Sequence, residues 1–78
     1  MQREVVTSSN INSIGFSKGP PAVLEVEFKG GGVYQYTSTD DKIVQNHYNQ
    51  LKLAESKGKY FTAHIRKDPA LKTHKVSG

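Results

Sequence analysis

The sequence predicts an α+β domain in which a three-stranded antiparallel sheet, a simple meander, is covered on one face by two C-terminal helices. Two patterns carry this prediction. Apolar and polar residues alternate in the first half of the chain, as in half-buried strands, and apolar residues later recur at three- and four-residue spacing, as on one helix face. The chain has 78 residues and no cysteine, so one small core without disulfides must hold it together.

Alternation predicts the first two strands. In "INSIGFSK", Ile14 and Phe16 alternate with small and polar residues. After a break at "GPP", the segment "AVLEVEFK" places Leu24, Val26 and Phe28 on one face and two glutamates and a lysine on the other. We therefore expect one face of the sheet to be buried and the other to be acidic and solvated.

The third strand is "VYQYT", which follows three glycines that suit a hairpin loop. If residues 30–32 form the loop, Phe28 faces Tyr34 and Val26 faces Tyr36, which matches apolar with apolar side chains. A two-residue turn would instead place both tyrosines beside the glutamates. We therefore expect Tyr34 and Tyr36 to lie on the core side of the sheet.

A first helix is predicted after the third strand. Ser38 precedes Asp41 by three residues, which is a capping arrangement typical of a helix start. Gly58 is expected to end this helix. Its apolar face consists of Ile43, Val44, His47, Tyr48, Leu51 and Ala54.

A second helix is predicted over residues 59–67, and it would bury Phe61 and Ile65, which lie four positions apart. The residues after it have little apolar content. We therefore expect a domain over residues 1–69 and a flexible basic tail over residues 70–78. The predicted structural core is Leu24, Val26, Phe28, Tyr34, Tyr36, Phe61 and Ile65.

Positive charge is concentrated at the C-terminal end of the chain, whose formal net charge is +4. Residues 57–78 carry six basic side chains against one aspartate, whereas residues 1–56 carry five basic and six acidic side chains. This distribution predicts an anion-facing surface built from the last third of the chain. A solvated tail is the alternative for the residues past Pro69.

No group of residues indicates an enzyme. The histidines His47, His64 and His74 lie 17 and 10 residues apart, which matches no metal-binding signature. The glycines at 30–32 lack the lysine and hydroxyl residue of a phosphate-binding loop. We expect no catalytic residue, no metal and no cofactor. The chain has neither a long apolar run nor a secretory leader, so we expect a soluble cytoplasmic protein that does not contact a membrane.

The segment "SKGKYFTAHIRK" interleaves basic and aromatic residues. Lys59 and Arg66 lie seven positions apart, so they would share one face of an α-helix. Basic side chains beside aromatic rings can bind phosphates and stack bases. The predicted function is therefore a non-enzymatic module that binds RNA or single-stranded nucleic acid. The candidate binding residues are Lys57, Lys59, Tyr60, His64, Arg66 and Lys67.

Two alternative functions stay open. The first is a protein-interaction module, for example a phage factor that binds a host protein or self-associates through an exposed sheet edge. The second is a pocket for a small anionic ligand such as a nucleotide. A steep salt dependence of binding to unrelated RNA sequences would favour the nucleic-acid module over both.

Three segments resemble successive motifs of the KTSC domain family. They are "SSNINSIGF", "LEVEFKGGGVYQY" and "SKGKYFTAHIR", and together they span about residues 5–66. The resemblance implies a small domain found at the C-terminus of some lysyl-tRNA synthetases and as a stand-alone bacterial or phage protein. RNA binding is suggested for this family but is not established for it. The sequence departs from the family in three places. It has "STDDK" where the family usually has a proline early in the first helix, and glycine where the family more often has Asn or Asp at the start of the hairpin turn. Its first helix is also longer than is typical.

Overall fold

The structure, a computed structural model, describes residues 2–77. The elements follow one another as β1 (Glu4–Val5), β2 (Ile11–Ser17), β3 (Ala22–Phe28), β4 (Val33–Ser38), α1 (Asp41–Leu53), α2 (Lys57–Tyr60), η1 (Phe61–Ile65) and β5 (Lys72–Ser77). Helix η1 is a π-helical continuation of α2. The described residues contain no helix of the length and apolar character needed to cross a membrane.

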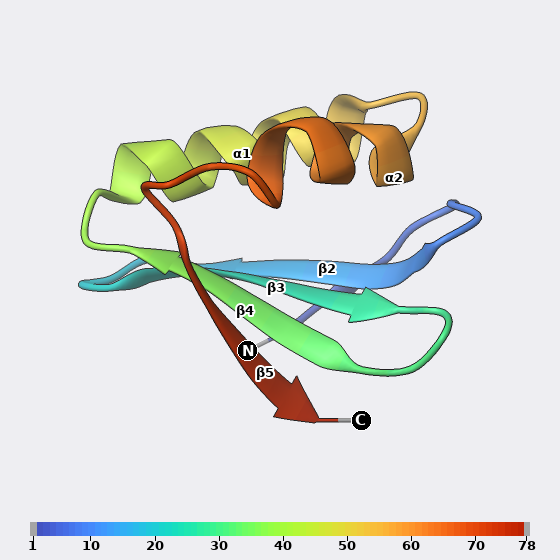
Figure 1. The fold of residues 1–78 in the computed structure, drawn as a ribbon, viewed down its shortest axis with the longest axis horizontal. Helices are drawn as coiled ribbons and strands as arrows, with labels where there is room; N and C mark the ends of the chain where they lie inside the picture. Colours follow the sequence, from blue (N-terminus) through green and yellow to red (C-terminus); the bar gives the residue numbers. More distant parts are fainter. Residues whose placement is uncertain (1, 78) are drawn as a thin grey trace.

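The protein has two layers, a sheet and a helical layer that covers one face of it (Figure 1). The sheet is antiparallel with the strand order β1-β2-β3-β4-β5, so every strand pairs with its neighbour in sequence. The α+β class is therefore confirmed, but the sheet has five strands where three were expected. The helices are not C-terminal, because the chain returns to the sheet after η1 to form β5.

The core lies between the helical layer and the sheet. Its buried side chains come from β2, β3, β4, α1 and η1, and they are Ile11, Ile14, Ala22, Leu24, Val26, Tyr36, Val44, Leu51, Phe61 and Ile65. Two residues expected in the core, Phe28 and Tyr34, are only partly buried and pack against this cluster. Their rings therefore keep some surface in contact with solvent.

The β3–β4 hairpin places both strand tyrosines on the helix side of the sheet. Tyr34 pairs with Val26, and Tyr36 pairs with Leu24. The sequence analysis had paired Tyr34 with Phe28, so the expected register is wrong by two residues. Because side chains alternate with a period of two, this shift leaves the tyrosines on the expected face.

The loop of this hairpin explains the difference in register. The amide of Phe28 donates to the carbonyl oxygen of Gly32 at 3.1 Å, which leaves residues 29–31 as the loop in place of residues 30–32. Gly31 and Gly32 have φ values of 101° and 95°, a region that favours glycine. Lys29 therefore belongs to the loop, and one glycine belongs to the returning chain.

Helix α1 begins two residues later than the capping pattern suggested, because its N-cap is at position 40 and not at position 38. The cap is Asp40, whose carboxylate accepts a hydrogen bond from the amide of Lys42 at 3.0 Å, while Ser38 accepts from the amide of Asp40. The helix ends at Leu53, so the prediction that Gly58 ends it is wrong. Helix α1 packs its apolar face, including the buried His47, against the sheet.

Gly58 lies inside α2 and allows a close approach. A Cβ atom at this position would lie 2.6 Å from Nδ2 of Asn10, in the loop between β1 and β2. The absence of a side chain therefore lets α2 sit directly against that loop. A packing requirement, and not a helix end, accounts for the glycine here.

Strand β5 corrects the expected domain boundary. Residues 72–77 pair with β4, and Leu71 packs against the core, so the folded domain extends past residue 69. All six side chains of β5 are exposed, and so the segment lacks the apolar alternation that marks a half-buried strand. The strand forms because the free edge of β4 carries backbone groups that need partners. Residue 78, also assigned to the tail, lies outside the described residues.

Candidate nucleic-acid interface

A π-helical turn determines where the basic residues after Tyr60 point. The amide of Arg66 donates to the carbonyl oxygen of Phe61 at 2.9 Å, a bond between residues five apart. A π-turn holds one more residue than an α-turn, so later residues fall about one position behind on the helix surface. Lys59 consequently lies near Lys67, and the expectation that it shares a face with Arg66 is wrong.

Lys59 and Lys67 line one hollow, which we call the lysine groove. Its other lining residues are Ser9, Asn10, Ser56, Gly58, Thr62 and Ala63, and its volume is about 630 Å³. Both lysines are exposed. The groove therefore presents two ammonium groups among small and polar neighbours.

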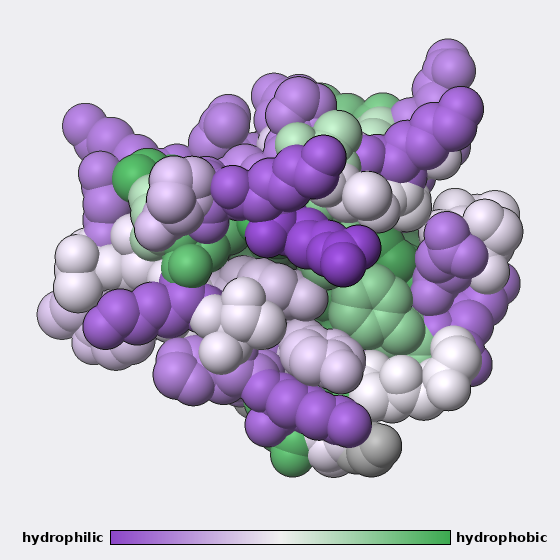
Figure 2. All heavy atoms as spheres, viewed as in Figure 1, coloured by the Kyte–Doolittle hydropathy of each residue, from purple (hydrophilic) through white to green (hydrophobic). Residues whose placement is uncertain are grey.

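Arg66 lines a different hollow, which we call the aromatic pocket. The pocket is bounded by Phe28, Tyr34, Tyr36, Phe61, Arg66 and Thr73 and has a volume of about 350 Å³. Figure 2 shows apolar surface left uncovered between the helical layer and the sheet, with hydrophilic side chains around it. Four aromatic side chains from β3, β4 and η1 thus line the same pocket as the exposed Arg66.

The aromatic rings of this pocket contact one another edge to face. The Phe28 ring centroid lies 5.7 Å from that of Tyr34 and 5.1 Å from that of Phe61, and Tyr36 lies 5.3 Å from Phe61. Such pairs hold each ring in a defined orientation. Burial raises the pKa of the Tyr36 hydroxyl to about 12, and the nearby Arg66 charge acts in the opposite direction.

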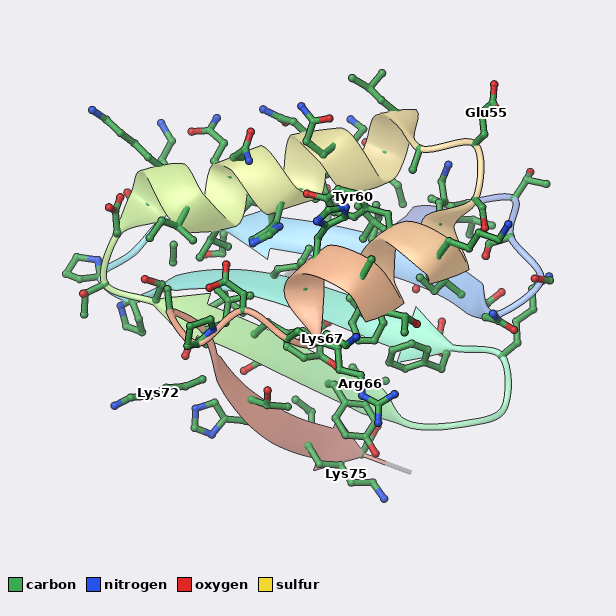
Figure 3. All side chains as sticks on the ribbon, turned by 45° about the horizontal axis from the view of Figure 1, so that its top comes forward. Glu55, Tyr60, Arg66, Lys67, Lys72 and Lys75 are labelled. Carbon is green, nitrogen blue, oxygen red and sulfur yellow. The ribbon has the colours of Figure 1, made fainter. Side chains whose placement is uncertain are left out.

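Strand β5 places a second cation beside Tyr34, one of the rings that line the aromatic pocket. Lys75 pairs with Tyr34 across the strands, and its Nζ lies 6.0 Å from the centroid of the Tyr34 ring. In Figure 3, Lys75 and Arg66 lie on the same side of the molecule, beside β5. Sequence reasoning missed Lys75 because it placed this residue in a tail. Its basic character was the available signal.

The charged group of Lys57 makes structural hydrogen bonds. Its Nζ donates hydrogen bonds to the carbonyl oxygens of Lys52 and Ala54, at 3.2 Å and 3.1 Å. These carbonyls lie at the C-terminal end of α1, where a positive charge is favourable. Of the four basic residues predicted as a binding site, Lys57 is thus the one whose charged group is held by the protein itself.

Tyr60 also makes an internal contact, through a network that the sequence did not reveal. Its hydroxyl lies 3.0 Å from Nδ1 of His47, and Nε2 of His47 lies 2.7 Å from Oδ2 of Asp68. A carboxylate can only accept, so Nε2 donates to Asp68, and when the ring is neutral its Nδ1 accepts from the tyrosine hydroxyl. The only sequence signal was the position of His47 on the apolar face of α1.

The network shifts the pKa values of the two outer groups. Burial raises the pKa of the Tyr60 hydroxyl, and the charge of Asp68 raises it further. The hydrogen bond from His47 lowers the pKa of the Asp68 carboxyl, assisted by the amide of Ala70. The Tyr60 ring centroid lies 4.8 Å from that of the exposed His64 ring. Part of the Tyr60 ring surface is therefore already next to His64 and is not free for stacking with a base.

Three carboxylates are engaged by residues that do not line the two hollows. Glu25 pairs with Arg3 at 3.3 Å, and Glu4 pairs with Lys52 at 3.6 Å. Glu27 accepts hydrogen bonds from Asn12 and Ser13, and these bonds lower its pKa. Within residues 2–77, no ion pair involves the cations around the two hollows. Those cations are Lys59 and Lys67 at the lysine groove, Arg66 at the aromatic pocket, and Lys75 beside the Tyr34 ring.

These features define a small α+β domain, in which a meander sheet is covered by a helical layer. Basic and aromatic side chains lie close together beside the helical layer. The KTSC domain family model matches residues 7–68, and the chain belongs to this family. The resemblance found in the sequence is therefore confirmed. An uncharacterized protein of Stutzerimonas stutzeri (strain A1501) is 34% identical over 61 residues, which cover 78% of this chain and 79% of that protein. Strand β5 lies beyond the residues that the family model matches.

Proposed function

We propose that this protein is a non-enzymatic module that binds RNA or another single-stranded nucleic acid. The observation that carries the proposal is that Arg66 lines the aromatic pocket and Lys75 lies beside its Tyr34 ring, with no carboxylate among the residues that line the pocket. Lys59 and Lys67 in the lysine groove provide further positive charge.

The chemistry of these surfaces suits a phosphate backbone. Phosphates attract exposed lysine and arginine side chains and release counterions on binding, which makes affinity depend steeply on salt. Proteins that bind single strands combine such charges with aromatic side chains on which bases stack. The outer face of the sheet is less suitable, because Glu25 and Glu27 lie on it.

The test is a titration of the protein with short single-stranded and double-stranded RNA and DNA at several salt concentrations. Each phosphate contact contributes about 0.7 to the slope of log affinity against log salt for a single strand. The double variant Arg66→Gln/Lys75→Gln should therefore reduce this slope by about 1.4. The loss should be the same for unrelated base sequences, because phosphates carry no sequence information.

A matched variant separates location from total charge. The variant Lys18→Gln/Lys42→Gln also removes two positive charges, but it removes them from the β2–β3 loop and the start of α1. Both lysines are exposed there. This variant should keep the wild-type slope. If the two double variants behave alike, the proposed surface is wrong. If the wild-type protein binds no nucleic acid at low salt, the proposed function itself fails.

A protein-interaction module is the second candidate, and one observation favours it. Strand β5 is an edge strand with exposed side chains, and such an edge can accept a strand from another chain. Its lysines, Lys72 and Lys75, oppose pairing with a second copy, because lysines on edge strands discourage edge-to-edge contacts. Binding to a protein that survives high salt, without binding to nucleic acid, would support this candidate.

A further inference from the structure

We propose that the aromatic pocket receives one unstacked base of a single strand, while Arg66 and Lys75 bind the phosphates on either side of that base. This inference rests on the proposed function and adds to it a defined contact. The aromatic side chains that the sequence pointed to as binding residues were Tyr60 and His64, whereas Tyr34 was expected in the core. The structure instead leaves the rings of Phe28 and Tyr34 partly accessible.

The pocket is built as a floor with two walls. Tyr36 and Phe61 form the floor, and their exposed fractions are only 5% and 8%. Phe28 and Tyr34 form the walls, and they are half-buried. A base that enters would therefore meet ring surface without unfolding the core, since the floor is already packed.

The Tyr34 wall is held in place before any ligand binds. Cε1 of its ring would lie 3.2 Å from a Cβ atom at Gly32, so the glycine lets the ring rest against the hairpin. Phe28 contacts the ring edge to face, and Lys75 lies over it. Ligand binding consequently loses little side-chain entropy at this wall, which favours affinity.

The charges around the pocket select an anionic ligand with a flat apolar part. Arg66 lines the pocket, and Lys75 approaches Tyr34 from β5. A purely apolar ligand would gain nothing from these cations, whereas a nucleotide unit in a strand offers a π-face and a phosphate on each side. The volume of about 350 Å³ is small for a ligand pocket and suits a single nucleotide unit. Bases inside a duplex are paired and stacked, so the expected ligand is a single strand.

The decisive experiment compares two strands that carry the same phosphates. One is an eight-nucleotide single strand, and the other is a strand of the same length in which every base is absent. Base stacking on an aromatic side chain strengthens binding by about 5- to 150-fold. The abasic strand should therefore bind more weakly by a factor in this range. Its salt slope should equal that of the normal strand, because the phosphate contacts are unchanged.

Variants of Tyr34 assign the effect to the pocket. Tyr34→Leu keeps an apolar side chain but removes the π-face, so the ratio of the two affinities should fall toward one. Binding of the abasic strand should stay at the wild-type level. Tyr34→Phe retains the ring and should retain the ratio. Circular dichroism and thermal melting of each variant verify that the fold persists.

The outcomes separate this inference from the proposed function. Equal affinity of the wild-type protein for both strands would overturn the base pocket and leave electrostatic nucleic-acid binding intact. A preference that Tyr34→Leu does not change would place the stacking elsewhere and would also overturn it. Failure of both strands to bind at low salt would overturn both proposals. A mononucleotide that binds as tightly as the strand would contradict the assignment of a strand as the ligand.

Discussion

Nε2 of His47 lies 2.7 Å from Oδ2 of Asp68, and this contact joins α1 to the turn that leads from η1 into β5. Through Nδ1, the same imidazole contacts the hydroxyl of Tyr60 at the junction of α2 and η1. His47 is 8% exposed, so both contacts are shielded from water. One side chain thus fixes three segments relative to one another. Two of these segments, the junction of α2 and η1 and the turn after η1, lie at the two ends of η1, next to residues of the proposed binding surface.

Replacing His47 with alanine should destabilise the protein by about 1 to 3 kcal/mol, the usual cost of leaving buried polar groups without their partner. The free energy of unfolding, measured by urea denaturation, is the readout. His64→Ala is the control, because His64 is exposed and its replacement should change stability by less than about 0.5 kcal/mol. A small effect of His47→Ala, equal to that of the control, would contradict a structural role for the network.

The Asp68 contact should make stability depend on pH in the acid range. Hydrogen bonding to His47 lowers the pKa of Asp68 from its ordinary value of 3.8. The folded protein therefore favours the charged carboxylate, so this contribution is present above about pH 4 and is lost as the pH falls through the lower, folded pKa. The stability difference between the wild-type protein and Asp68→Asn should shrink below about pH 4. Urea denaturation at a series of pH values measures it, and a constant difference would refute the assignment.

Tyr36 should produce the opposite dependence at alkaline pH. Burial raises its pKa from 10.0 to about 12, so the folded protein favours the neutral hydroxyl. The corresponding stability is complete below about pH 10 and is lost as the pH rises toward 12. Tyr36→Phe cannot ionise and should lose less stability over this interval than the wild-type protein. Parallel pH profiles of the two proteins would show that the Tyr36 hydroxyl ionises equally in the folded and unfolded states.

The strands and the first helix could be predicted because burial leaves a pattern in the sequence. Leu24 and Val26 alternate with glutamates, and the buried residues of α1, such as Val44 and Leu51, recur at helical spacing. Strand β5 leaves no such pattern, since all its side chains are exposed and only its backbone is held. The register of the hairpin was missed for a related reason. Loops of residues 29–31 and 30–32 put the same side chains on the same face, so burial could not distinguish them.

The candidate site was harder to predict than the fold. The basic and aromatic composition of residues 57–67 drew attention to a segment that contributes Lys59, Lys67 and Arg66 to the two hollows. The direction of each side chain, however, depends on the π-turn over Phe61–Ile65, and no residue of that turn signals it. The aromatic pocket was missed because it joins Phe28, Tyr34 and Arg66, which are distant in sequence. Alternation could assign Tyr34 to the helix side of the sheet, but it could not show that the helices leave this ring partly uncovered.

The π-turn leads to a final prediction about which lysines bind phosphates. Lys59 and Lys67 line the lysine groove, whereas Nζ of Lys57 donates to carbonyl oxygens at the end of α1. Lys59→Gln/Lys67→Gln should therefore lower the salt slope of single-strand binding by about 1.4 and leave the melting temperature nearly unchanged. Lys57→Gln should keep the slope and lower stability by about 0.3 to 1 kcal/mol, the typical value of a cation at a helix C-terminus.

Salt titrations and thermal melts of the same three proteins provide both readouts. The two variants thus serve as controls for each other, because each is expected to change one measurement and to leave the other near the wild-type value. A slope lowered by Lys57→Gln would mean that its Nζ leaves α1 to reach the nucleic acid. An unchanged slope in Lys59→Gln/Lys67→Gln would remove the lysine groove from the binding surface and confine phosphate contacts to the side of η1 that carries Arg66.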